Sequence, residues 1–120
     1  MKSYLKVLLT AGVFALSLVA FQEDASADTM LTSWYGPGLE GNPTASGDIF
    51  EPYTEYTAAS PYYPFGTQLL VTYGDASVVV EVTDRGPYVA GRELDLSAVA
   101  AEEIGLTYIG TDYVDVEVIE

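Results

Sequence analysis

The pattern of apolar positions after the N-terminal segment fits strands better than helices. Residues 69–73 and 78–83 alternate with a period of two, which places successive side chains on opposite faces of a sheet. Gly74 and Asp75 lie between these segments and suit a tight turn. We therefore predict a β-hairpin over residues 69–83.

Two further segments fit strands, and a third fits a loop. In residues 114–118 valine alternates with aspartate or glutamate, which predicts a half-buried strand. Residues 30–36 (MLTSWYG) form a shorter strand candidate. Residues 36–48 (GPGLEGNPTASGD) contain too much Gly, Pro, Ser and Asn for regular structure, so we predict a long exposed loop there.

One helix is predicted within residues 95–105 (DLSAVAAEEIG). Asp95 or Ser97 can cap its first turn, and Gly105 is placed to end it. The residues expected to face the core are Leu96, Val99, Ala100 and Ile104. The chain is therefore expected to be mainly β with one short helix, and a closed barrel is favoured because it leaves no edge strand exposed.

The N-terminus has the pattern of a secretory signal peptide. Two lysines precede an apolar run of fifteen residues, and QEDASA ends in the small-x-small pattern of a cleavage site. We expect cleavage near Ala27, with residues 1–27 as signal peptide and residues 28–120 as one domain. The run is shorter than the about 20 residues of a membrane span, so we expect export to the periplasm or outside the cell, without a stable membrane anchor. The chain has no cysteine, so we expect neither a lipoprotein nor a disulfide framework.

Charge narrows the possible partners. The chain has 18 acidic residues against 4 basic ones, and beyond position 6 the only basic residues are Arg85 and Arg92. A net charge of −14 repels phosphate at long range, so we expect no nucleic-acid partner. The acidity fits solubility in a salty medium, or a specific cationic partner such as a basic protein, and the sequence leaves both open.

The residue types leave few kinds of catalysis. The predicted domain has no histidine, cysteine or lysine, which removes the common nucleophilic triads and the usual zinc ligands. We expect no metal and no cofactor. Carboxylates alone can cleave a glycosidic bond, because one of them can donate a proton to the leaving oxygen while water, a second carboxylate or a substrate hydroxyl attacks the carbon. The remaining possibilities are catalysis by carboxylates and no catalysis at all.

Asp84 is the best candidate acid or base by position. It follows the most apolar predicted strand and precedes a Gly-Pro turn, which would place it at a barrel rim, partly shielded from water. A turn cap, or an ion pair with Arg85 or Arg92, explains the same spacing. For the two arginines we predict a structural role, in which they fix the loop by bonding carboxylates such as Asp95.

Other acidic and aromatic residues are candidate binding groups. Asp48 and Glu51 follow a Ser-Gly turn and could orient sugar hydroxyls, or could form a solvated acidic turn. Aromatic rings in or beside the predicted loops could stack on sugars or pack locally. These are Trp34, Tyr35, Phe50, Tyr53, Tyr56, Tyr62, Tyr63, Phe65 and Tyr88.

In this order, the segments resemble the RlpA-like family of exported double-psi β-barrel domains, named for rare lipoprotein A. The matching motifs are WYG at 34–36, TASG at 44–47, PFGT at 64–67, DRGP at 84–87 and GRELDLS at 91–97. The resemblance implies a six-stranded double-psi β-barrel with one or two short helices, related to expansins. It also implies an endolytic transglycosylase that acts on peptidoglycan and prefers glycan strands without stem peptides.

The resemblance also implies roles for individual residues. In the family's reaction the 6-hydroxyl of a MurNAc residue adds to its own C1 and leaves a 1,6-anhydro end, so one acid/base carboxylate can suffice. By position Asp84 takes this role, and Arg85, Arg92 and Asp95 are structural. The expected glycan contacts are Asp48, Glu51, Ser60, Tyr35 and Tyr88.

One position departs from the family pattern. Active members have histidine in a TAAH motif, whereas residues 57–60 read TAAS, so Ser60 occupies the histidine's place. Serine does not act as an acid or base near neutral pH without a partner. Either Asp84 works alone at a reduced rate, or the domain is a non-catalytic, expansin-like binding module. The expected partner is peptidoglycan in both cases, and we expect a monomer.

Overall fold

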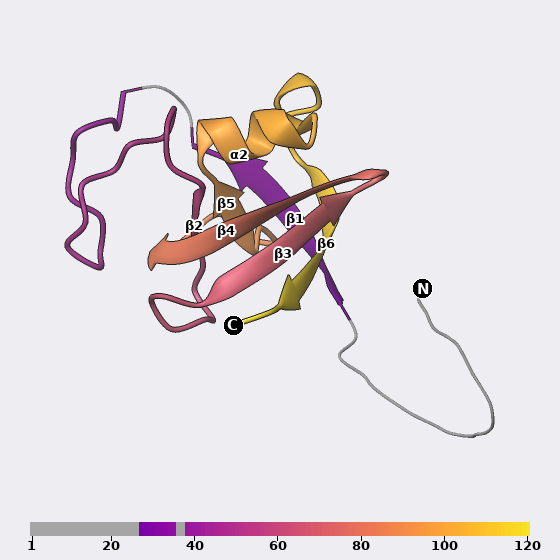
Figure 1. The fold of residues 1–120 in the computed structure, drawn as a ribbon, viewed down its shortest axis with the longest axis horizontal. Coiled ribbons are helices and arrows are strands. Elements are labelled where there is room, and N and C mark those ends of the chain that lie inside the picture. Colours follow the sequence, from indigo (N-terminus) through magenta and orange to yellow (C-terminus); the bar gives the residue numbers. More distant parts are fainter. Residues whose placement is uncertain (1–26, 36–37) are drawn as a thin grey trace.

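The computed structural model describes residues 27–35 and 38–120, so nearly all of the predicted signal peptide lies outside the described residues. In the described part, six strands close into a barrel in the order β1-β5-β2-β4-β3-β6 (Figure 1). Their bounds are β1 (Asp28–Trp34), β2 (Thr57–Ala59), β3 (Gln68–Tyr73), β4 (Ala76–Asp84), β5 (Leu94–Leu96) and β6 (Asp112–Val118). The helices are α2 (Ala98–Glu103) and the 3-10 helix η2 (Leu106–Tyr108). The mainly β barrel expected from the sequence is confirmed.

The predicted hairpin is confirmed. Strands β3 and β4 pair antiparallel from Gln68 opposite Glu81 to Tyr73 opposite Ala76. Gly74 adopts a φ of 62°, which a glycine reaches without steric cost in the connecting turn. Side chains facing the barrel interior are fully buried, whereas the intervening Val79 is exposed. The alternation in the sequence therefore reports which side of the hairpin faces the core.

The C-terminal strand is confirmed as well. Strand β6 pairs antiparallel with both β1 and β3, and so closes the barrel. Val114 and Val116 are buried, whereas Val118 near the end is half exposed. Because both sides of β6 are hydrogen-bonded, the barrel has no free edge at this point.

The helix prediction was partly wrong. Asp95 and Leu96 belong to β5, which pairs parallel with β1 and antiparallel with β2, and the helix begins after Ser97. The Ser97 hydroxyl does not cap the helix, since it accepts a hydrogen bond from the Thr57 backbone N–H instead. Alanines 98, 100 and 101 are buried, whereas Val99 is only half-buried. The barrel pairing therefore takes backbone groups that a longer helix would have used.

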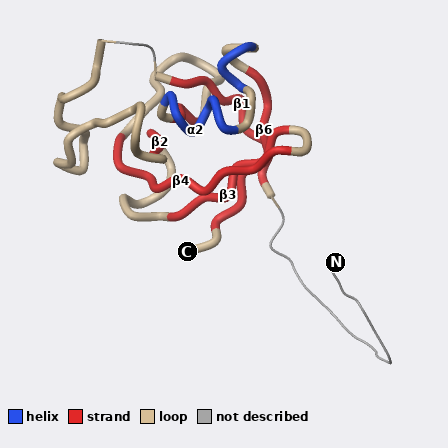
Figure 2. Tube along the Cα trace, turned by 45° about the horizontal axis from the view of Figure 1, so that its top comes forward, coloured by secondary structure: helices blue, strands red, loops and turns tan. Residues whose placement is uncertain are grey.

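Residues 38–56 form a long loop, which stands to one side of the barrel (Figures 1 and 2). The loop was predicted over residues 36–48, of which 36 and 37 lie outside the described residues, and it continues eight residues further. The loop folds back on itself through a bridge between Pro43 and Ile49. Its tip returns to the barrel, where the Ser46 N–H donates to the Thr83 carbonyl at 3.1 Å. The end of β4 is thus crossed by this segment, which positions the site described next.

Candidate functional site

Asp84 is the last residue of β4, at the rim of the barrel. It lies opposite Ala59 of β2, at a register shift in that pairing, and Ala59 lies opposite Asp95 of β5. Asp84 and Asp95 are therefore in one row across three adjacent strands. Both side chains are partly buried, as expected for a rim position.

The Asp84 carboxylate has donors on both oxygens. Oδ1 accepts the backbone N–H groups of Ala45 at 2.9 Å and Arg85 at 2.8 Å. Oδ2 accepts the Tyr35 hydroxyl at 2.9 Å. Oδ1 is therefore held by two main-chain donors, whereas the donor to Oδ2 is a side-chain hydroxyl.

Tyr35 is fixed by packing as well as by this hydrogen bond. Its ring lies 4.5 Å from the buried Phe50 ring, centroid to centroid, in a tilted arrangement. Burial, with the nearby Asp84 charge, raises the pKa of Tyr35 well above its ordinary value. The phenol therefore stays protonated and serves as a donor to Asp84. These groups line a cavity of about 170 Å³ together with Leu39, Asn42, Pro43 and Thr44.

Arg85 braces the neighbouring loop, but not through carboxylates. Its Nη1 donates to the Ser60 carbonyl at 3.1 Å and the Tyr63 carbonyl at 3.0 Å. Its guanidinium carbon lies 3.9 Å from the centroid of the Phe65 ring, a cation–π contact. Among the described residues, carbonyl oxygens rather than the expected carboxylates accept from this side chain, and its structural role stays a prediction. The loop of residues 60–65 is therefore tied directly to the residue after Asp84.

Arg92 and Asp95 are related more loosely. No hydrogen bond or ion pair joins their side chains among residues 27–35 and 38–120, although the Arg92 charge acts on the Asp95 carboxylate. Asp95 accepts a hydrogen bond from the Ser33 hydroxyl on β1. Burial outweighs both effects and raises the pKa of Asp95 above its ordinary value.

Ser60 is fully buried at the position where the resemblance expects histidine. Its hydroxyl accepts the backbone N–H groups of Tyr62 at 3.0 Å and Tyr63 at 3.2 Å. Its own N–H donates to the Asp84 carbonyl at 3.1 Å. The side chain therefore shapes the turn, and a glycan contact through this hydroxyl stays a prediction that its burial speaks against.

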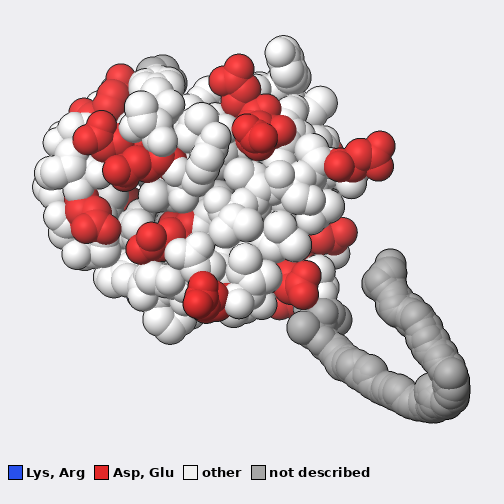
Figure 3. Space-filling model, in the orientation of Figure 1, with Lys and Arg blue, Asp and Glu red and all other residues white. Residues whose placement is uncertain are grey.

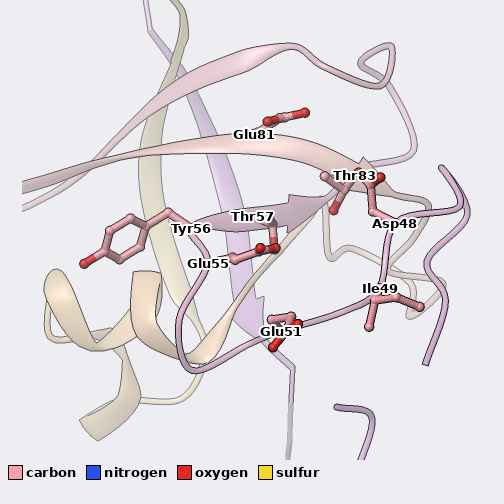
Figure 4. A pocket seen from close by; sticks show the side chains of 8 residues that line it. All are labelled: Asp48, Ile49, Glu51, Glu55, Tyr56, Thr57, Glu81 and Thr83. Atoms are coloured by element: carbon pink, nitrogen blue, oxygen red, sulfur yellow. The ribbon is translucent and has the colours of Figure 1, made fainter. Parts of the chain in front are cut away.

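Asp48 and Glu51 lie in a different hollow from Asp84. They line a cavity of about 540 Å³ together with Glu55 and Glu81 (Figure 4). Tyr88 is 85% exposed and its ring lies close to Gly86, and its contact with a glycan stays a prediction. Of the predicted site residues, Asp84 and Tyr35 thus line the smaller cavity and Asp48 and Glu51 the larger one, whereas Ser60 and Tyr88 line neither.

Sequence reasoning missed several groups of this site. The donor at Ala45 is a backbone N–H, so the residue type does not reveal it, although Ala45 belongs to the TASG motif. Glu55 and Glu81 come from a loop and from the outer face of β4, so no local spacing links them to Asp48. Only the path of the loop across the end of β4 brings them together.

Charge on the surface follows the composition. On the face shown in Figure 3, every coloured side chain is acidic, and many gather on the loop side of the barrel. Among the described residues, no helix is long and apolar enough to cross a bilayer. Within the same residues, no three potential ligand side chains converge as a metal ion would require.

Comparisons with known proteins point to one family. The family model described as lytic transglycolase matches residues 27–118. A probable endolytic peptidoglycan transglycosylase RlpA from Synechocystis sp. is 44% identical over 92 residues, which are 75% of this chain and 28% of that protein. The RlpA protein of the same description from Aquifex aeolicus is 51% identical over 76 residues, 62% of this chain and 33% of that protein. The chain thus spans about a third or less of the length of these relatives.

Solved structures share the fold. Streptomyces papain inhibitor superposes with a TM-score of 0.66 at 17% identity, over 78% of this chain and 94% of that one. Cerato-platanin 3 from M. perniciosa gives a TM-score of 0.58 at 12% identity, over 78% of this chain and 95% of that one. At such identities the similarity is one of architecture.

Proposed function

Because this chain belongs to the RlpA-like family of double-psi β-barrel lytic transglycosylases, we propose that it cleaves peptidoglycan glycan strands endolytically and leaves 1,6-anhydro ends. The observation that carries the proposal is the Asp84 carboxylate, which two fixed main-chain donors orient at the barrel rim. Asp84 is the proposed acid/base, and peptide-stripped strands are the proposed substrate. We further propose that the protein acts outside the cytoplasmic membrane, where this polymer lies.

The reaction needs one proton donor that later becomes a proton acceptor. Protonated Asp84 gives its proton from Oδ2 to the glycosidic oxygen as the bond from that oxygen to C1 breaks. The 6-hydroxyl of the same MurNAc ring then bonds to C1, and its proton returns to Oδ2. The proton balance closes without water, and Asp84 ends the cycle protonated as it began.

Tyr35 acts as a positioning residue for this carboxyl group. When Asp84 is ionised, the Tyr35 hydroxyl stabilises the negative charge on Oδ2 by donating to it at 2.9 Å. When Asp84 is protonated, the phenol oxygen can accept from the same atom. One side chain therefore serves both halves of the reaction without changing its own protonation.

A second function, glycan binding without cleavage, is supported by Ser60. Its hydroxyl is buried and committed to the Tyr62 and Tyr63 amides, so it gives Asp84 no acid/base partner. In this case Asp84 would accept hydrogen bonds from sugar hydroxyls. The two functions share the site and differ only in bond breaking.

The test compares the purified protein with Asp84→Asn on peptide-stripped peptidoglycan. The proposal predicts anhydro-ended fragments by mass spectrometry, with a loss of about 10²–10⁴-fold in the variant, the usual contribution of an acid/base group. Asp75→Asn is the matched control, because it makes the same change at an exposed turn away from the site.

The outcomes separate the two functions. Equal fragment release by the Asp84 variant and the wild type would remove Asp84 from the mechanism. If neither releases fragments while both co-sediment with the glycan, the binding function replaces cleavage.

A further inference from the structure

The larger cavity has a lining unlike that of the Asp84 hollow. It has a volume of about 540 Å³, and its walls come from the loop and from β4. Figure 4 shows Glu81 on one side and Glu51 on the other, with Glu55 between them and Asp48 beside Thr83 at one end. This volume lies within the range of about 300–1,000 Å³ that is usual for organic ligands.

Four carboxylates line this cavity without any basic residue beside them. The two described arginines are placed elsewhere, since Arg85 bonds carbonyls and Phe65 while Arg92 acts on Asp95. Like charges around one space raise the energy of the unliganded protein, and a cation would relieve that repulsion. No three of the described carboxylates converge on one point, so a larger, organic cation fits better than a metal ion.

A buried hydroxyl adds an independent feature. The Thr83 side chain borders the cavity and is only 6% exposed. No residue among 27–35 and 38–120 makes a hydrogen bond with its hydroxyl, although its carbonyl accepts the Ser46 N–H. Buried hydroxyls normally have a partner. A ligand with a polar group would supply it.

We infer that this cavity binds a glycan ring that carries a free ammonium group, an amino sugar that is not N-acylated. The carboxylates neutralise the ammonium and accept hydrogen bonds from the ring's hydroxyl groups, while the Thr83 hydroxyl bonds one further polar group. The inference rests on the proposed function, because it treats the cavity as a neighbouring subsite for the strand that reaches Asp84. It assigns a preference for partly deacylated strands.

The experiment uses a matched pair of ligands, the β-1,4-linked tetramers of glucosamine and of N-acetylglucosamine. Binding is measured by calorimetry at pH 6, where reference carboxylates are ionised and an amine is protonated. We expect the glucosamine tetramer to bind at least about tenfold more tightly, and this ratio to shrink as salt is added. Free lysine and a lysine-containing tetrapeptide form a third arm, which tests an ammonium group from a peptide source.

Substitutions in the cavity lining test whether the preference for the glucosamine tetramer arises there. Glu55→Gln combined with Glu81→Gln should remove most of the preference, because it halves the number of carboxylates around the cavity. Glu102→Gln with Glu103→Gln on α2 is the matched control, since it removes the same charge from an exposed helix surface. Thr83→Val should weaken binding of the glucosamine tetramer by about fivefold, the value of one hydrogen bond.

Each outcome decides a different question. Equal affinity for the two tetramers, or an equal loss in the α2 control, would overturn the inference. Tighter binding of the peptide than of the glucosamine tetramer would reject the sugar as the source of the ammonium. A retained preference in Asp84→Asn without any cleavage by the wild type would leave this subsite standing while the proposed function fails.

Discussion

Two hollows are lined by the loop of residues 38–56 and by the end of β4, and their charged groups are arranged in opposite ways. In the smaller one, Asp84 receives three hydrogen bonds from within the protein. In the larger one, four carboxylates face a wide space without a basic neighbour. The comparison shows that internal donors fix the orientation of the carboxylate at the rim, whereas the carboxylates that line the larger cavity have no basic neighbour to offset their charge.

The largest expected effect tests how firmly the Asp84 side is braced. Arg85→Ala removes two charged hydrogen bonds to carbonyls and the Phe65 contact. We expect the free energy of unfolding to fall by about 2–4 kcal/mol, measured by urea denaturation. Arg92→Ala, whose side chain has no such contacts among the described residues, should change it by less than about 0.5 kcal/mol. Equal losses would mean that the two arginines brace the loop alike, and the contrast between the hollows would weaken.

A smaller effect is expected from removing the Tyr35 hydroxyl, which donates a hydrogen bond to Oδ2 of Asp84. Tyr35→Phe keeps the packing against Phe50 and removes only the hydroxyl. A hydrogen bond to a charged group contributes about 1.5–3 kcal/mol, so kcat on peptide-stripped glycan should fall roughly 10–150-fold while KM changes little. Tyr113→Phe, at an exposed position on β6, is the control. A rise in KM with constant kcat would instead assign Tyr35 to substrate binding.

The smallest effect concerns Asp95. Its carboxylate accepts a hydrogen bond from one side chain, so it lies between Asp84, with three donors, and the carboxylates of the larger cavity. Burial is the main cause that raises its pKa above 3.8, so the folded state binds a proton more tightly than the unfolded chain. The free energy of unfolding therefore falls as pH rises from 3.8 through the raised pKa. Asp95→Asn removes this dependence and keeps an acceptor for Ser33.

This variant should consequently gain stability relative to the wild type as pH rises from 4 to 7. The gain should stay below about 1 kcal/mol, because the carboxylate is partly solvated and near Arg92. Urea denaturation at the two pH values measures it. A stability difference independent of pH would show that Asp95 titrates alike in both states.

The sequence predicts the parts of the fold that rest on local pattern. The hairpin of β3 and β4 follows from a period of two and a Gly-Asp turn. Strands β2 and β5 have only three residues each, and their order comes from pairing with strands distant in the chain. Such pairing leaves no periodic signal, so Asp95 and Leu96 were assigned to the helix.

For the site, the sequence predicts the positions of side chains better than their contacts. Asp84 was correctly expected at the barrel rim. Its donor at Ala45 is a backbone N–H, which the residue type does not indicate. Arg85 was expected on carboxylates because opposite charges attract, whereas the folded loop offers it carbonyl oxygens. Glu55 and Glu81 become neighbours of Asp48 only through the path of the loop.

The crossing of β4 by the Thr44–Phe50 segment also has a consequence for how such a domain can diversify. The loop segment of residues 44–50 donates two main-chain N–H groups to β4, from Ser46 to the Thr83 carbonyl and from Ala45 to the Asp84 carboxylate. Because these donors are main-chain groups, side chains of the segment can be exchanged without removing either hydrogen bond. A lineage, or a laboratory selection, could therefore vary the side chains of this segment while the Asp84 carboxylate keeps its main-chain donor.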